Sequence, residues 1–591
     1  MSTTSETTLS QPVVDGAPNP PRLHDESVTS EIGDSSRTAS QLRDALGAST
    51  SPSEEKPTDV RDLHVYPSGL SLALICLGLG LAVFCLGLDR SILATAIPKI
   101  TNDFDSLNDV AWYGSSYLLT TCCFQLMFGK LYVEFKTTWI FLLALALFEL
   151  GSLVCAVAPS SIALIIGRSI AGIGCAGLLS GALIILANSV PLHKRPIYTG
   201  LIGAVSGIAQ IIAPTLGGVF TDHATWRWCF WINLPLGAVT AAVVVFVKFP
   251  IKTQRRHITG VRVFVHAIDL LGTVVFMPCI ICLLLALQWG GTTYAWSNWR
   301  IIMCLCFFAV LGFTWGCIQY RRGDDGTLPS RLLKQRSVVS GMLFTLGISG
   351  SLFIVTYYVP IWFQSVKNTT AEQSGVNFLT ATGGMSLAAV LGGIAASRIG
   401  YYVPQMILSS IVSSIAAGLI YRYSLNTTTG YWVGTLILFG VGAGLGLQMP
   451  LTAVQTVLKG ADISLGTSAI VLVQTISGTI FLAVGQNVFQ AKLLEELSIT
   501  APEVDPRLVV SNGVSGLVVL ITETYGAAVA KEVLEAYNAA LRRCFMVCVI
   551  LAPLTILGAV GMEWKNVRQG KHASEDSRQE EVGLAKMPSA T

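Results

Sequence analysis

Apolar stretches of about 20 residues follow one another along most of this chain, and each is long enough to cross the hydrocarbon core of a bilayer as a helix. Only 12% of the 591 residues are charged, and the mean hydropathy is +0.61. A soluble domain carries about 25% charged residues. The apolar surface therefore needs lipid, and we expect an all-α membrane protein.

The positions of the apolar runs predict about fourteen transmembrane helices. An even number of crossings puts both termini on one side of the membrane. The loops on that side hold most of the Lys and Arg residues, such as Lys194, Arg195 and Arg336, so the positive-inside rule places both termini in the cytosol. The predicted helices lie at roughly 70–96, 110–132, 138–158, 161–189, 197–219, 227–248, 267–288, 300–319, 338–363, 374–397, 404–423, 431–452, 465–489 and 542–563.

The remaining segments differ from these runs in composition. Residues 1–66 are rich in Ser, Thr, Pro and acidic residues with few aromatics, which predicts a disordered cytosolic tail. Residues 249–265 form a basic cytosolic linker, and 564–591 a second cytosolic tail. Residues 490–541 are less apolar, and we predict an external loop that contains a short amphipathic helix.

Two Asn-Thr-Thr sequons begin at Asn368 and Asn426. Such sequons are N-glycosylation acceptors in secreted or externally exposed loops. Both fall in loops that the predicted topology places outside, which supports the helix count and makes both asparagines candidate glycosylation sites.

Charged residues inside the apolar runs are few, and each needs an explanation because a charge at the bilayer centre costs about 2.5–3.5 kcal/mol on insertion scales. They are Asp89, Arg90, Glu149 and Arg168. Because successive helix residues point about 100° apart, Asp89 and Arg90 need not pair with each other. Asp269 opens a predicted helix and is expected to be its N-cap.

Asp89 is the candidate proton carrier, because burial favours the protonated form of a carboxylate and a new pathway to water allows it to discharge. A structural ion pair is the alternative. Arg168 could help to discharge a nearby carboxylate, or could anchor to backbone carbonyls. Glu149 is a candidate cavity residue. These groups suit a transporter driven by protons.

Glycine marks two of the predicted helices. The run 161–189 contains five glycines that remove side-chain bulk, which permits close approach of a neighbouring helix. In the run 197–219, Pro214 removes a backbone hydrogen bond, and Gly207, Gly217 and Gly218 lower the cost of bending. This helix is predicted to be a hinge or a tight-packing surface.

The sequence lacks the motifs that several other functions require. No Gly-Lys-Ser or Gly-Lys-Thr is present, which argues against ATP hydrolysis by a P-loop within this chain. The 14 cysteines show no metal-ligand spacing, and a net charge of +3 is too small to suggest a nucleic-acid partner. We expect no enzyme activity, no cofactor and no metal.

Three segments carry a family resemblance. The first, "LDRSILATAIPKITNDFDSLNDVAWYGSSYLLT", contains Asp89; the second, "GRSIAGIGCAG", contains Arg168, Gly172 and Gly174; the third is "APTLGGVFTDHATWRWCFWINLP". From about residue 70 to 565 the chain resembles the major facilitator superfamily, specifically the fourteen-helix drug:proton antiporter branch of fungal multidrug and mycotoxin efflux pumps. It departs from the family pattern at Val133, where the motif has Asp, and at Ala213, where it has Gly.

The resemblance implies two six-helix bundles, at 70–248 and 338–563, with the linker and two extra helices between them at 249–337 and a central cavity. It also links Asp89 and Arg168 to proton transfer, and Gly207, Pro214, Gly217 and Gly218 to the antiporter motif. The candidate cavity residues, besides Glu149, are Gln210, Asn377, Gln448 and Gln474.

The implied function is proton-coupled efflux of small amphipathic molecules, such as drugs, toxins or fungal secondary metabolites, by a monomer in the plasma membrane. A roomy cavity with few fixed charges suits such molecules. The alternatives are a proton-coupled siderophore transporter, a vacuolar amino-acid carrier in a vacuolar or vesicle membrane, and a transporter-like receptor that does not transport.

Overall fold

Helices make up almost all of the computed structural model, which describes residues 66–67, 69–106, 109–246, 268–291, 293–504, 521–522 and 524–568. Within these ranges the β-structure is limited to one isolated bridge between Gly290 and Tyr294. The predicted linker at 249–265 lies outside the described residues, as do residues 1–65 of the predicted tail and residues 569–591.

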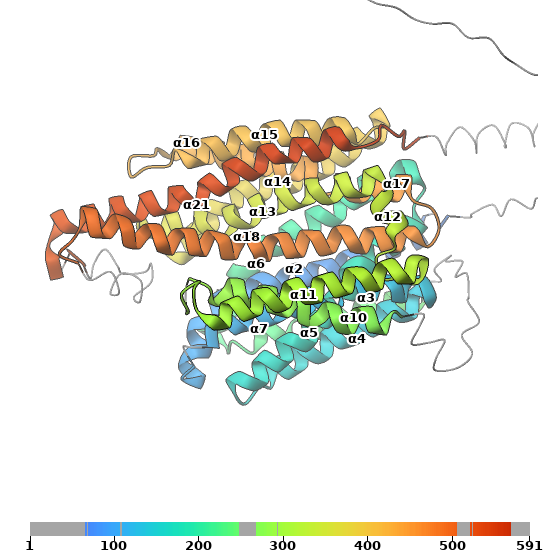
Figure 1. Cartoon of the computed structure of the whole chain (residues 1–591), viewed down its shortest axis with the longest axis horizontal. Coiled ribbons are helices and arrows are strands. Elements are labelled where there is room, and N and C mark those ends of the chain that lie inside the picture. The colour runs from blue at the N-terminus through green and yellow to red at the C-terminus, as the bar shows by residue number, and fades with distance from the viewer. Residues whose placement is uncertain are drawn as a thin grey trace, which may run out of the picture. The chain divides into compact units, whose positions relative to one another are not determined.

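The helices from α2 to α8 lie in the part of the chain for which the sequence predicts the N-terminal bundle. They are coloured from blue to green in Figure 1. Helix α2 contacts α5, α6 and α8, and α5 packs between α3 and α4. Their bounds are α2 Leu70–Phe104, α3 Val110–Glu134, α4 Thr137–Ala156, α5 Ser161–Ser189, α6 Arg195–His223, α7 Trp228–Trp231 and α8 Asn233–Phe246.

The second group packs in a similar way, with α13 against α18 and α21 and with α16 between α14 and α15. Two further helices, α10 and α11, pack against each other, and α10 also contacts α3 and α18. The bounds are α10 Leu270–Trp289, α11 Trp299–Arg322, α12 Ser330–Lys334, α13 Arg336–Ser365, α14 Ala371–Ile399, α15 Val403–Tyr421, α16 Thr429–Leu447, α17 Met449–Val457, α18 Asp462–Thr500 and α21 Ala527–Gly561.

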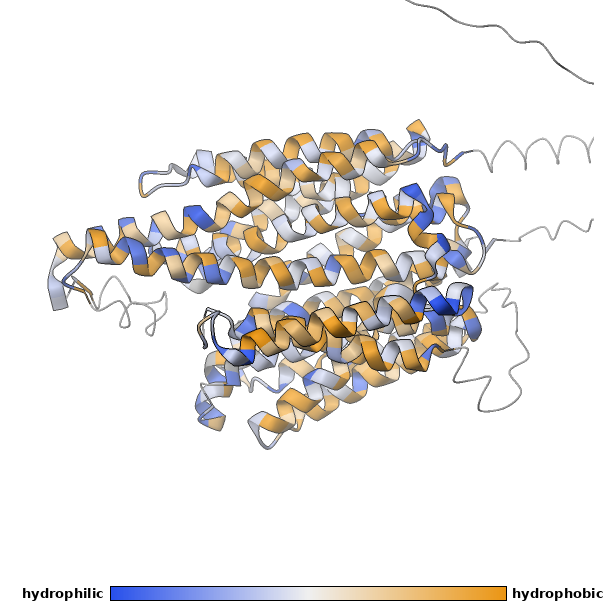
Figure 2. Cartoon of the chain, viewed as in Figure 1, coloured by the Kyte–Doolittle hydropathy of each residue, from blue (hydrophilic) through white to orange (hydrophobic). Residues whose placement is uncertain are grey.

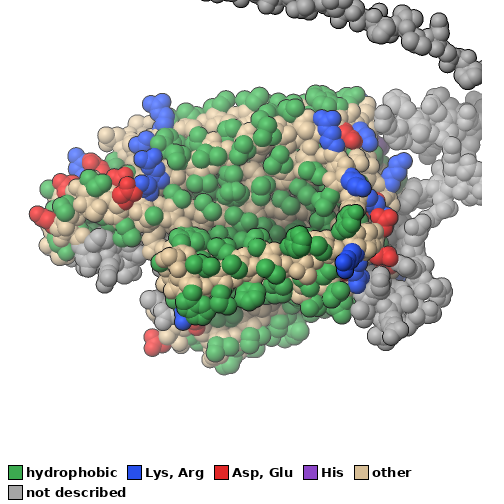
Figure 3. Space-filling model, viewed as in Figure 1, with side chains coloured by type: hydrophobic (Ala, Val, Ile, Leu, Met, Phe, Trp, Pro, Cys, Tyr) green, Lys and Arg blue, Asp and Glu red, His purple; other side chains and the backbone are tan. Residues whose placement is uncertain are grey.

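The described residues contain thirteen spans that are long and apolar enough to cross a membrane. The one predicted helix not among them is α3, which has 25 residues but carries polar groups such as Ser115, Ser116 and Lys130. Hydrophobic residues dominate the helix bodies and hydrophilic ones gather toward their ends (Figure 2), and on the face in view charged side chains likewise cluster at the two ends (Figure 3). The chain is a multi-pass membrane protein.

The glycines of α5 allow the close packing that the sequence predicts. A Cβ atom added at Gly174 would lie 2.4 Å from the backbone nitrogen of Phe148 on α4, and one at Gly172 would lie 2.3 Å from the carbonyl oxygen of Tyr117 on α3. Real Cβ atoms do not approach other atoms this closely. Only glycine therefore fits where α5 crosses α3 and α4.

The predicted external loop at 490–541 is wrong in its extent. Helix α18 continues to Thr500, and α21 already begins at Ala527. The physical reason is that apolar side chains on these extensions, Leu493, Leu497 and Val533 among them, are buried in one cluster. The amphipathic helix predicted within this loop is the first part of α21.

At one end of the bundle, α5 and α17 end, and α6, α13 and α18 begin. We call this end the basic end. The opposite end, which we call the sequon end, carries the exposed Asn368 and Asn426. Their loops touch, because the Lys367 Nζ donates a hydrogen bond to the carbonyl oxygen of Leu425 at 2.7 Å.

The two groups of helices meet closely near the basic end. Leu183 of α5 is buried among residues of α13, α17 and α18, and the Arg195 guanidinium donates to the carbonyl oxygen of Gln455 at 3.2 Å. On α6, a Cβ atom at Gly200 would lie 2.4 Å from the carbonyl oxygen of Ala389 on α14. These contacts hold the two groups of helices together near the basic end.

A candidate proton-coupling site and cavity

Asp89 and Arg168 form a buried ion pair between α2 and α5. The Arg168 Nη1 lies 2.6 Å from the Asp89 Oδ2, and both side chains are almost fully buried, with exposed fractions of 2% and 0%. A buried charge pair is tolerated only when further hydrogen bonds satisfy its remaining atoms. The site must therefore contain additional partners.

Arg168 has two of these partners on α3. Its Nε donates to the carbonyl oxygen of Tyr113 at 3.0 Å, and its guanidinium lies 4.4 Å from the ring centre of Tyr117, within the range of a cation–π interaction. The guanidinium thus anchors to a backbone carbonyl and also pairs with a carboxylate. Its help in discharging a proton from that carboxylate stays a prediction.

Asn233 is a site residue that the sequence analysis did not single out. It is the first residue of α8, and its Nδ2 lies 3.4 Å from the Asp89 Oδ1 and 3.2 Å from the Ser152 Oγ on α4. The available signal was an uncharged amide directly after the apolar run "WCFWI". Both bonds are long, so the amide links α2 to α4 only weakly.

Arg90 turns away from Asp89, as the helical spacing allows. Its Nη2 donates to the Cys175 Sγ at 3.4 Å, and its guanidinium lies 6.0 Å from the ring centre of Tyr117. The two neighbouring charges of α2 therefore have separate partners, and only Asp89 joins the ion pair with Arg168.

Glu149 lies between α4 and α8 with both carboxylate oxygens buried. Neither oxygen accepts a hydrogen bond from any described residue. The carboxyl group packs against Gly237, where a Cβ atom would lie only 1.9 Å from the Glu149 Oε1. The predicted role of Glu149 in lining a cavity stays a prediction.

The motif residues of α6 face different neighbours. A Cβ atom at Gly207 would lie 2.3 Å from the Ser386 Oγ on α14, whereas one at Gly217 would lie 2.1 Å from the Thr95 Oγ1 on α2. Gly218 has open space around it, and Pro214 lies inside the helix. The helix therefore has tight contacts with both groups of helices, while its role as a hinge stays a prediction.

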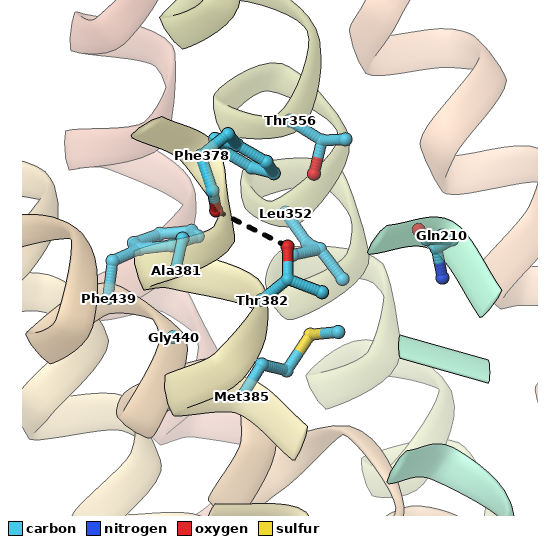
Figure 4. Close-up of a pocket in the computed structure, with 9 residues that line it drawn as sticks. All are labelled: Gln210, Leu352, Thr356, Phe378, Ala381, Thr382, Met385, Phe439 and Gly440. Atoms are coloured by element: carbon cyan, nitrogen blue, oxygen red, sulfur yellow. Dashed lines mark hydrogen bonds between the residues drawn. The ribbon is translucent and has the colours of Figure 1, made fainter. Parts of the chain in front are cut away.

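A small pocket lies between α6 and the helices α13, α14 and α16 (Figure 4). Gln210 of α6 faces it from one side, where its amide also donates to the Ser206 carbonyl oxygen at 3.2 Å. The opposite lining is aromatic or aliphatic apart from the hydroxyls of Thr356 and Thr382, and it contains no charged residue. The lining residues are Gln210, Leu352, Thr356, Phe378, Ala381, Thr382, Met385, Phe439 and Gly440.

The other candidate cavity residues do not line this pocket. Gln448 reaches α6, where its Nε2 would lie 2.8 Å from a Cβ atom at Gly203, and its Oε1 is buried without a hydrogen bond from the described residues. Asn377 on α14 and Gln474 on α18 are half-buried. Their contact with a substrate stays a prediction.

Asp269 is the N-cap of α10, as predicted. Its side chain accepts a hydrogen bond from the backbone nitrogen of Gly272 at 3.0 Å. It also accepts one from the Gln319 amide at 2.7 Å and forms an ion pair with Arg322 at 3.1 Å. The residue thus ties the start of α10 to the end of α11.

Comparison with known proteins gives relatives over most of the chain. The family model described as the Major Facilitator Superfamily matches residues 79–482. The MFS-type efflux pump MFS1 of Arthroderma benhamiae is 47% identical over 507 residues, which is 85% of this chain and 93% of that protein. The efflux pump aflT of Aspergillus parasiticus is 46% identical over 505 residues, 85% of this chain and 98% of that protein.

Solved structures agree at the level of the fold. The proton:xylose symporter XylE aligns with a TM-score of 0.52 over 84% of this chain and 98% of its own, at 12% sequence identity. At this identity the likeness concerns the fold alone. The family match and the two fungal relatives all span most of the helices described above. This chain therefore belongs to the major facilitator superfamily.

Proposed function

We propose that this protein exports small amphipathic molecules across the plasma membrane in exchange for protons. The observation that carries the proposal is the buried ion pair between Asp89 and Arg168. Intramembrane ionisable residues in transporters mark substrate or proton pathways. The relatives from Arthroderma benhamiae and Aspergillus parasiticus are both named efflux pumps, which supports the direction of transport.

The pocket supports the substrate class. Its lining offers apolar and aromatic surface with one amide and two hydroxyl groups, and no charge among the lining residues. Such a surface favours neutral or weakly charged molecules that are held chiefly by apolar contact. Fungal secondary metabolites, drugs and toxins share this chemistry.

The mechanism is alternating access. We place the basic end in the cytosol, which puts both termini there and both sequons outside. In the conformation described here the contacts of Leu183, Arg195 and Gly200 close the cytosolic end, and Asp89 is paired with Arg168. Proton binding to Asp89 requires this pair to separate, which couples the carboxylate to a change in the packing of α2 and α5.

A single proton supplies enough free energy for this task. Moving it down about 100 mV and one pH unit releases roughly 3.7 kcal/mol, which corresponds to a several-hundred-fold substrate gradient. The protein needs no second subunit for this coupling, because both members of the ion pair come from one chain, and we propose that it acts as a monomer and carries out no enzymatic reaction.

The test uses purified protein in sealed vesicles with a labelled amphipathic compound, a pH difference and a membrane potential. We expect uphill movement of the compound against the proton flow in the wild type. Asp89→Asn should abolish it while the protein remains folded in the membrane.

Transport that ignores both gradients would contradict the proposal, as would an unchanged Asp89→Asn variant. Accumulation in the same direction as the protons would indicate an uptake carrier. Substrate binding without any transport would indicate a receptor.

A further inference from the structure

Glu149 is the one carboxylate within the described transmembrane helices whose oxygens are buried and accept no hydrogen bond from a described residue. It lies about 18 Å along α4 from Thr137, near the middle of a hydrocarbon core about 30 Å thick. A charged carboxylate at this depth costs about 2.5–3.5 kcal/mol on insertion scales even with some access to water. No donor offsets that cost here, so the environment accommodates Glu149 as the neutral acid.

Asp89 lies close to Glu149 and, unlike it, has a charged partner. The two carboxyl groups interact electrostatically, but only Asp89 has a cation, at 2.6 Å. Two carboxylates that are close to each other and differ this strongly in their surroundings divide the roles, with one ionised and the other protonated. In this conformation Glu149 is therefore the carboxyl group suited to hold a proton, whereas Asp89 has the Arg168 guanidinium as its partner.

A chain of polar groups leads from Asp89 to within one helical turn of Glu149. The Asn233 amide donates to the Asp89 Oδ1 and to the Ser152 Oγ. Ser152 lies three residues after Glu149 on α4, and Gly237, which the Glu149 carboxyl contacts, lies four residues after Asn233 on α8. The Asn233–Ser152 bond and the Glu149–Gly237 contact both join α4 to α8. They lie one helical turn apart on each of these helices.

The neighbouring elements add no cation that faces Glu149. Helix α8 carries no ionisable residue between Asn233 and Phe246. The charged and titratable groups on the elements around Glu149 include the Cys85 thiol, Asp89 and Arg90 on α2, and Arg168 and the Cys175 thiol on α5. They also include Tyr117, Lys130, Tyr132 and Glu134 on α3, where Lys130 and Glu134 pair with each other, and the Cys229 thiol on α7.

We propose that Glu149 is a second proton-carrying group, which holds a proton while Asp89 is paired with Arg168 and passes it to Asp89 when that pair opens. The O–H bond at Glu149 breaks, an O–H bond at Asp89 forms, and the negative charge moves to Glu149. The Asn233 amide, freed from Asp89, lies one turn away and donates to the new carboxylate. Glu149 then regains a proton from the end of the bundle that is open to water.

The inference rests on the proposed proton-coupled export and is tested in the same vesicles with Glu149→Gln. Glutamine has the shape of the neutral acid and cannot release a proton. We expect exchange of labelled for unlabelled compound at equal pH to keep its wild-type rate, and the initial rate of gradient-driven transport to fall about a hundredfold. The matched control is Glu495→Gln, which removes an exposed carboxylate paired with Lys492 and should leave both rates unchanged.

The outcomes separate the two proposals. A wild type that ignores the pH gradient overturns the export mechanism itself. A gradient-driven wild type whose Glu149→Gln variant keeps the full driven rate, or loses exchange and driven transport together, overturns only the role of Glu149.

Infrared difference spectroscopy gives a second measurement that does not depend on the folding of the Glu149 variant. The wild type and Asp89→Asn should both show the carbonyl band of a protonated carboxylic acid, shifted in heavy water, and Glu149→Gln should lack it. Absence of this band from the wild type would overturn the inference.

Discussion

A methyl group added at Gly200 should shift the protein away from the conformation described here. The Cβ atom of Gly200→Ala would lie 2.4 Å from the carbonyl oxygen of Ala389, an atom of the α14 backbone that no rotamer change can move. Overpacking of this kind costs about 1–3 kcal/mol. The cost applies only while α6 and α14 touch at the basic end, so the equilibrium between closed and open states should change by about 5–150-fold.

The distance between α6 and α14 at the basic end reports this equilibrium. Spin labels on Lys194→Cys and Arg398→Cys, which replace two exposed side chains, would be measured by pulsed electron resonance in nanodiscs after reactive native cysteines are removed. Gly375→Ala on α14 is the matched control, because a Cβ atom there meets nothing within 4 Å. A Gly200→Ala distance distribution identical to that of the control would refute the reasoning.

Three further outcomes follow from contacts described above. Arg168→Lys keeps the charge beside Asp89 but loses the planar guanidinium that also reaches α3, so transport should slow and the melting temperature in detergent should fall relative to the wild type. Asp269→Ala removes the N-cap of α10 and the carboxylate that faces the half-buried Arg322 guanidinium, which should cost about 0.5–2 kcal/mol and appear as a lower thermal midpoint, with no change meaning that the cap contributes nothing. Asn368→Gln and Asn426→Gln should each increase electrophoretic mobility by one glycan, and a mobility equal to that of the wild type would show that the site is unoccupied.

The helices of the fold were predictable because a segment that crosses the hydrocarbon core of a bilayer has to be apolar. A run such as 161–189 has to be apolar over its whole length, and its predicted bounds agree with those of α5. The extensions of α18 and α21 were missed because charged residues such as Glu495 and Lys531 lower the hydropathy of this segment. Their buried side chains follow helical spacing, as Leu493 and Leu497 do, and that pattern was the available signal.

The charged residues of the candidate site were predictable from the sequence, but their pairing was not. Asp89 and Arg168 are conspicuous because charge inside apolar runs is rare, but their contact depends on the rotation and register of α2 against α5, which hydropathy does not encode. The same limit applies to Asn233, and to Glu149, whose missing partners depend on which face of α4 meets Gly237. Packing geometry between helices, rather than their existence, is what the structure adds.

The extended parts of α18 and α21, which pack against each other, have a practical consequence for imaging this protein. Helix α18 has 39 residues and is therefore about 58 Å long, whereas a bilayer with its headgroups spans about 40–45 Å. Figure 1 shows both helices reaching past their neighbours, and the apolar side chains between them keep this pair stiff. An antibody fragment raised against it would supply a rigid marker beyond the sequon end for aligning particles of a transporter whose other described residues offer little mass outside a detergent belt.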